Sequence, residues 1–161
     1  MSIMTKVGMA DLKVVKHPGS LTTLGLGSCI GICLYDPSTK TIGMAHIMLP
    51  SSKTIKNNQN VAKFADTAIV KLIADMKSTG ANTRRLVSKI AGGSQMFKFS
   101  SGNDMMKIGQ RNAEAVRAIL KENNIPILAD DTGGNFGRTI EFYSETGILM
   151  IKTIGHGVKE V

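Results

Sequence analysis

The chain has 161 residues, of which 42% are hydrophobic and 20% charged, and its formal net charge is +8. This composition excludes a disordered chain and predicts a single domain over residues 1–161 with a substantial core. No stretch approaches the roughly 20 apolar residues that cross a bilayer, and residues 1–15 lack the apolar segment of a signal peptide, so we expect a cytoplasmic protein without membrane insertion.

The positive charge favours an acidic partner, but the lysines are scattered along the chain and aromatic residues make up only 4%. No nucleic-acid-binding module is recognisable, so we rank an acidic protein surface above DNA or RNA as the partner. A basic surface that simply keeps the protein in solution is an equally good interpretation.

In chain order, the apolar pattern predicts strands within residues 6–16, 30–35, 41–49, 86–91, 126–129, 139–143 and 148–154. Three- and four-residue apolar spacing predicts two helices, one over 61–76 with Asn60 as its cap and Gly80 as its end, and one over 108–120. Residues 97–107 and 130–135 read as loops. The predicted fold class is α+β, a layered α/β sandwich of mostly antiparallel or mixed β-sheet with two main helices.

The most informative stretch of the sequence contains Cys29 and His46. Cys29 follows the glycine-bracketed turn 25–28, and the two strands after it are joined by a short connection that ends with Lys40. Antiparallel pairing of these strands carries His46 back toward the level of Cys29. The sequence therefore predicts a Cys/His pair.

A cysteine acts as a nucleophile only as the thiolate, so it needs a base, and a third group usually orients that base. Thr22 and Thr23 offer hydroxyl groups for this third role. The turn containing Gly27 and Ser28 can direct backbone N–H groups at an oxyanion. The reaction class that fits is acyl transfer from an amide or ester.

A second glycine turn follows the strand at 86–91 and consists of Gly92, Gly93 and Ser94. Its backbone amides could face a substrate or partner. A tight turn demanded by the fold is an equally good interpretation.

Several alternatives stay open from the residues alone. Free cysteines and strand histidines are often buried structural residues. From the residues alone, a structural role for Cys29 and His46 has about the same weight as a catalytic one. The three-residue spacing between Cys29 and Cys33 fits neither a zinc knuckle nor a redox motif, so we expect no metal and no cofactor. Asp131 within an Asp-Thr-Gly sequence allows a remote alternative, a homodimeric aspartic protease.

Six segments together closely resemble the CheD family of chemoreceptor glutamine deamidases, in the order of that family. They are residues 23–29, 43–50, 63–68, 89–97, 108–112 and 131–135.

The resemblance implies a cysteine hydrolase that converts glutamines of methyl-accepting chemotaxis receptors to glutamate, and that hydrolyses receptor methyl esters as a further activity. It assigns Cys29 as nucleophile, His46 as base and Thr23 as the third catalytic residue. The implied fold is shared with the catalytic domain of a toxin of the cytotoxic necrotizing factor type. It also implies a CheC-type CheY-P phosphatase as a partner, and the alternative function is therefore non-catalytic regulatory binding to that phosphatase and to receptors.

Overall fold

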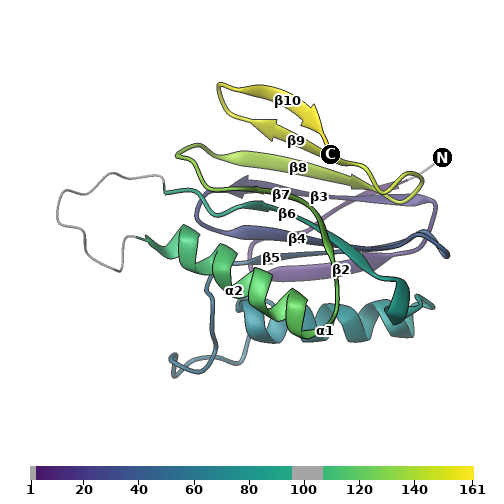
Figure 1. Ribbon diagram of the computed structural model, residues 1–161, viewed down its shortest axis with the longest axis horizontal. Coiled ribbons are helices and arrows are strands. Elements are labelled where there is room, and N and C mark those ends of the chain that lie inside the picture. The colour runs from purple at the N-terminus through teal and green to yellow at the C-terminus, as the bar shows by residue number, and fades with distance from the viewer. Residues whose placement is uncertain (1–2, 96–106) are drawn as a thin grey trace.

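The computed structural model describes residues 3–95 and 107–161 (Figure 1). The strands in these ranges are β1 (Ile3–Lys6), β2 (Asp11–Val15), β3 (Gly19–Leu26), β4 (Ile30–Asp36), β5 (Thr41–Ile47), β6 (Val87–Gly92), β7 (Ile127–Thr132), β8 (Arg138–Tyr143), β9 (Leu149–Thr153) and β10 (Gly157–Glu160). The helices are α1 (Ala65–Ser78), α2 (Ile108–Glu122) and a short 3-10 turn, η1 (Thr83–Arg85). The loop expected over residues 97–107 falls almost entirely on 96–106, which lie outside the described ranges.

The strands form two mixed five-stranded sheets. The outer sheet has the order β1-β3-β8-β9-β10, and the central sheet has the order β2-β5-β4-β6-β7. Both long helices lie on the same side of the central sheet, and the outer sheet covers its other face (Figure 1). The α+β layered sandwich predicted from the sequence is confirmed.

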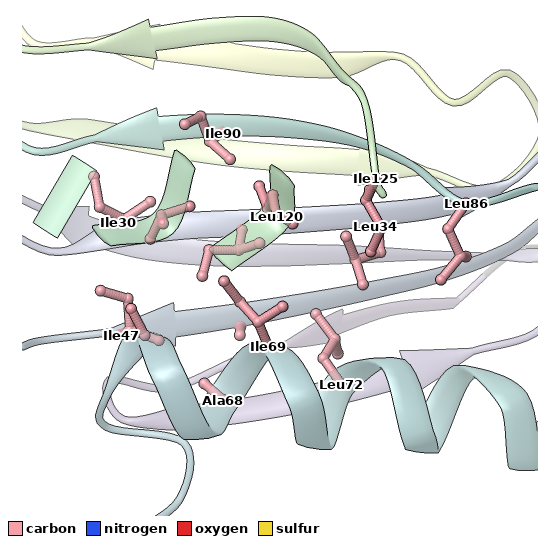
Figure 2. Packing of buried hydrophobic residues seen from close by; sticks show 14 of the residues in the cluster. Ile30, Leu34, Ile47, Ala68, Ile69, Leu72, Leu86, Ile90, Leu120 and Ile125 are labelled. Carbon is pink, nitrogen blue, oxygen red and sulfur yellow. The ribbon is translucent and has the colours of Figure 1, made fainter. Parts of the chain in front are cut away.

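One core lies between the helices and the central sheet. Figure 2 shows Ile69 and Leu72 of α1 facing Leu34 and Ile47 of the central sheet, with Leu120 of α2 beside them. These helix residues belong to the periodic apolar stripes that the sequence displays, and burying a Leu or Ile side chain stabilises the fold by about 1.5–3 kcal/mol.

A second core lies between the two sheets and contains Cys29 and Cys33 beside aliphatic side chains of β3, β8 and β9. Gly31 allows the sheets to approach closely here, since a Cβ at this position would lie 2.6 Å from Cδ1 of Ile140. The inward face of the β4/β5 hairpin is therefore enclosed by the outer sheet.

The structure confirms the β4/β5 hairpin, the second helix and the β8/β9 hairpin, in which Gly147 has a φ of +72° as its turn requires. Within residues 3–95 and 107–161, neither long helix has both the length and the apolar character that crossing a membrane demands.

The structure corrects several expectations about the elements. The strand region expected over 6–16 holds one strand, β2 (Asp11–Val15), and meets β1 only at Lys6, because the chain turns at Ala10, whose φ is +56°, and the two strands join different sheets. Helix α1 begins at Ala65 rather than near residue 61, because Leu49 forms a bridge with Phe64 that keeps the preceding backbone extended. Asn60 instead accepts a hydrogen bond from the N–H of Ala62.

Two further differences between the expected and the observed elements are in the C-terminal half. Strand β7 continues through Asp130, Asp131 and Thr132, which the sequence placed in a loop, because parallel pairing with β6 extends to Gly92. Strand β10 was not predicted, since every one of its residues is exposed and its sequence lacks an apolar period.

Candidate active site

The β4/β5 hairpin brings Cys29 and His46 to the same part of the space between the sheets. Gly31 pairs directly with His46, and Cys29 precedes Gly31 by two residues, so both side chains belong to the same face of the central sheet. Cys29 is 7% exposed and His46 is 1% exposed. The predicted antiparallel pairing of β4 with β5 is confirmed, and it places His46 opposite Gly31, near the start of β4.

Thr23 reaches this space from the outer sheet. The β3/β8 register shifts between Thr23 and Leu26, and Gly25 within this irregularity has a φ of +69°. Leu21 and Thr23 are buried at a spacing of two, whereas the next buried residue is Leu26, at a spacing of three. The bulge thus keeps both Thr23 and Leu26 on the inward face on either side of two exposed residues.

The hydroxyl group of Thr23 joins His46 to the backbone. Its Oγ1 lies 2.7 Å from Nδ1 of His46 and donates a hydrogen bond of 2.7 Å to the carbonyl of Val7. A hydroxyl has a single proton, so the atom that donates to Val7 must accept from Nδ1–H. The imidazole is therefore held in the tautomer that leaves Nε2 unprotonated, and Nε2 is buried with no hydrogen-bond partner among the described residues.

Burial favours the neutral form of both reactive groups. Desolvation raises the pKa of the Cys29 thiol, although the backbone N–H of Cys29 lowers it in part. Desolvation lowers the pKa of His46. Near neutral pH the site thus holds a neutral thiol and a neutral imidazole rather than a thiolate–imidazolium pair.

The turn that presents Cys29 is fixed by the second glycine turn. Gly93 N–H donates to the carbonyl of Cys29 at 2.9 Å, and Ser94 N–H donates to that of Gly27 at 2.8 Å. The N–H of Gly27 is also occupied, at 3.0 Å from the carbonyl of Gly25. Among the described residues, no turn or loop carbonyl accepts from the N–H of Ser28 or Cys29, and the N–H of Cys29 acts on its own thiol, so neither group is tied to another part of the chain.

Gly92 permits the close approach of the two turns. A Cβ on this residue would lie 2.2 Å from the carbonyl oxygen of Cys29, and its φ is +116°. No other residue type fits such a position without displacing the turn.

A buried arginine that sequence reasoning did not single out supports the second turn. Arg138 is 2% exposed, and its Nη1 donates to the carbonyl of Gly92 at 3.2 Å and to Oγ of Ser94 at 2.8 Å. Its Nε lies 3.1 Å from the carboxylate of Asp131, which also pairs with Lys159 at 2.9 Å. The Asp131 carboxylate thus pairs with two cations of this chain, whereas an aspartic-protease dyad sets it against a second carboxylate.

The second cysteine and His17 have surroundings that differ from those of Cys29 and His46. Cys33 is fully buried, and burial raises the pKa of its thiol despite the nearby charge of Lys89. His17 is exposed and lies 2.9 Å from Oγ of Ser144. Across residues 3–95 and 107–161, no cluster of three His, Cys, Asp or Glu side chains could hold a metal ion.

Sequence reasoning also missed Asn112 on α2. Its side chain is fully buried and donates to two backbone carbonyls of the site. A signal was present, because Asn112 is a polar residue on the otherwise apolar stripe of a helix.

Comparison with known proteins shows which proteins this chain resembles. A family model described as "CheD chemotactic sensory transduction" matches residues 48–153. A protein of Caldanaerobacter subterraneus named "Probable chemoreceptor glutamine deamidase CheD" is 60% identical over 156 residues, which are 97% of this chain and 96% of the relative. A protein of the same name from Lachnoclostridium phytofermentans is 57% identical over the full length of both chains. The "Chemoreceptor glutamine deamidase CheD" of Halalkalibacterium halodurans is 54% identical, again over the full length of both.

Proposed function

Because this chain belongs to the CheD family, we propose that it is a cysteine hydrolase that deamidates particular glutamine side chains of methyl-accepting chemotaxis receptors to glutamate. The observation that carries the proposal is the bond between Thr23 and Nδ1 of His46. It leaves Nε2 of His46 as a proton acceptor on the strand that pairs beside Cys29.

In the first half of the reaction, Nε2 of His46 takes the proton of the Cys29 thiol, and the thiolate attacks the carbon of the side-chain carboxamide. The oxyanion that forms accepts hydrogen bonds from the backbone N–H groups of Ser28 and Cys29. The imidazolium then donates its proton to the carboxamide nitrogen of the substrate and the C–N bond breaks. Ammonia departs, and a thioester remains on Cys29.

In the second half, His46 takes a proton from water, and the resulting hydroxide attacks the thioester carbonyl. The C–S bond breaks, the side chain leaves as the carboxylic acid and loses its proton to solvent to become glutamate, and the proton on His46 passes to the sulfur of Cys29. Thr23 orients the imidazole through both halves, as an acidic residue does in other triads. Because a hydroxyl group is neutral, it stabilises the imidazolium less than a carboxylate would, and we expect modest turnover.

The substrate glutamine would lie on an exposed helix of the receptor's cytoplasmic coiled coil. Such surfaces are often acidic, and the net charge of +8 would steer them toward this protein. Small residues around the glutamine would let the shallow turn at Cys29 approach the carboxamide.

The experiment that tests the proposal is mass spectrometry of a receptor cytoplasmic fragment from the same organism, incubated with the parent protein or with Cys29→Ala. Conversion of glutamine to glutamate, a gain of about 1 Da per site, by the parent alone would support both the activity and the nucleophile. Deamidation that survives Cys29→Ala would rule out the thiol mechanism.

The same acyl chemistry extends the proposal to receptor methyl esters, since the thiolate attacks an ester carbonyl in the same way and methanol leaves in place of ammonia. Release of methanol from a methylated receptor fragment by the parent, and not by Cys29→Ala, tests this activity.

A second role, binding to a CheC-type phosphatase, is favoured by the same basic charge, which suits an acidic protein surface. Here Cys29→Ala should leave the complex intact, because the substitution removes the reaction and not the surface. Loss of the complex in that variant would tie binding to the active site.

A further inference from the structure

We propose that Asn112 is a positioning residue. It aligns Cys29 with His46 by joining the turn of residues 25–29, called here the nucleophile turn, to the residues that follow β5. The inference rests on the proposed function, because it concerns how that Cys/His pair is held in register.

The contacts of Asn112 are divided between the two catalytic segments. Its Nδ2 donates to the carbonyl of Ser28 at 2.9 Å and to that of Met48 at 3.0 Å. Ser28 is adjacent to Cys29, and Met48 follows His46 by two residues. One amide group thus uses both of its N–H donors to join the segment of the nucleophile to the segment of the base.

The orientation of this amide follows from its partners. Both neighbours of Nδ2 are carbonyl oxygens, which accept and cannot donate, so exchanging the nitrogen and oxygen of Asn112 would place three acceptors together. The orientation with two donated hydrogen bonds is the one that satisfies the site.

Asn112 is costly to keep at this position. Its Oδ1 is buried without a hydrogen-bond partner among the described residues, and an unpaired buried acceptor costs about 1–3 kcal/mol. Val116 and Leu120 continue the same helix stripe as apolar core residues. A side chain selected only for packing at this position would bring no oxygen, whereas an amide that donates both of its N–H groups also brings its oxygen, here without a partner among the described residues.

The geometry of α2 is arranged to bring Asn112 this close. Gly109 lies one turn earlier, where a Cβ would be 2.5 Å from the carbonyl oxygen of Ser94 and 2.6 Å from that of Gly93. The helix therefore packs directly on the turn whose N–H groups hold Cys29 and Gly27. The nucleophile turn is fixed from this side by Gly93 and Ser94, and Asn112 adds the link to β5.

The test compares Asn112→Ala with the matched control Asn123→Ala. Asn123 is at the other end of α2, where its exposed side chain donates to the carbonyl of Ile119 and, within residues 3–95 and 107–161, to no other group. Asn112→Leu is the second variant, because it keeps the branched shape and the number of side-chain heavy atoms and so leaves no cavity if the alanine variant folds poorly.

The first readout is the deamidation of a receptor fragment. We expect both Asn112 variants to lower kcat by about 10- to 100-fold with KM within about threefold, since small misplacements of reacting groups cost up to this factor. Asn123→Ala should retain the parent kcat. An unchanged kcat in both Asn112 variants, or a raised KM alone, would overturn the inference.

The second readout does not need the receptor substrate. The rate of Cys29 alkylation by iodoacetamide near neutral pH is followed by peptide mass spectrometry, and the ratio of the rates with and without His46→Ala measures how strongly His46 activates the thiol. We expect this ratio to fall toward one when Asn112 is replaced. A purely structural role would loosen the turn and expose the thiol while leaving the ratio unchanged, and that result would overturn the inference.

The two proposals fail differently. If the parent shows no deamidation but its alkylation ratio still depends on Asn112, the receptor activity is wrong and the positioning role stands. If the parent ratio is itself one, Cys29 and His46 are not a working pair, and both proposals fall.

Discussion

The hydroxyl group of Thr23 lies 2.7 Å from Nδ1 of His46, although the two residues are on different sheets. The bond crosses the interior of the sandwich and is completed by the carbonyl of Val7, in the connection between β1 and β2. Three separate segments of chain thus determine which nitrogen of the imidazole carries the proton.

Replacement of Thr23 by valine tests this tautomer control. Thr23→Val keeps the shape but removes the hydroxyl. We expect kcat/KM to fall by about 10- to 100-fold, at or below the low end of the factor that a general base contributes, because His46 itself remains. Thr23→Ser keeps the hydroxyl and should recover most of the activity.

Thr22→Val is the matched control for this series. Thr22 also donates to a backbone carbonyl, that of Ile140, but forms no hydrogen bond with a histidine in the part of the chain that the structure describes. An equal loss of activity in Thr22→Val would show that Thr23 acts on the strand rather than on His46.

The pH dependence of kcat/KM should reflect the neutral resting pair. Desolvation lowers the pKa of His46 below its ordinary value of 6.5, so the imidazole remains a base at pH values where an exposed histidine is already protonated. We therefore expect activity to be maintained as the pH falls through 6.5 and to be lost only below it. An acid limb that lies above about pH 7 would contradict a desolvated, neutral His46.

Gly92→Ala should disrupt the nucleophile turn. The added Cβ meets the carbonyl of Cys29 in a backbone conformation with positive φ, and we expect a loss of about 2 kcal/mol or more in the free energy of unfolding together with loss of activity. Gly80→Ala is the matched control, because Gly80 has a similar φ of +107° with nothing within 4 Å of an added Cβ. Denaturant unfolding of both variants separates the backbone cost, which they share, from the clash, which belongs to Gly92.

Cys33→Ala should retain the catalytic activity of the parent. Cys33 is fully buried two residues beyond Gly31, and the structure gives it a packing role in the core between the sheets. We expect the free energy of unfolding to fall by about 1 kcal/mol and kcat to remain within about twofold. A Cys33→Ala variant as inactive as Cys29→Ala would show that the wrong thiol has been assigned.

Local pattern was enough to predict a large part of the fold and the candidate Cys/His pair. The β4/β5 hairpin follows from two apolar runs and a four-residue connection over 37–40, and its register alone brings His46 opposite Gly31, two residues from Cys29. Strand β10 and the true start of α1 were missed, because an exposed edge strand has no apolar period and because a bridge between Leu49 and Phe64 overrides the helical spacing before Ala65.

The amino-acid sequence by itself determined most of the elements, the nucleophile and base candidates, and the resemblance to a family, since these depend on residues close together in the chain or on motifs in order. Only the tertiary structure decided how the pair is supported. Asn112 reaches Ser28 across 84 positions of sequence, and Arg138 reaches Gly92 across 46. Such contacts form when the sheets and helices pack against one another, and no periodicity within a single strand or helix specifies them.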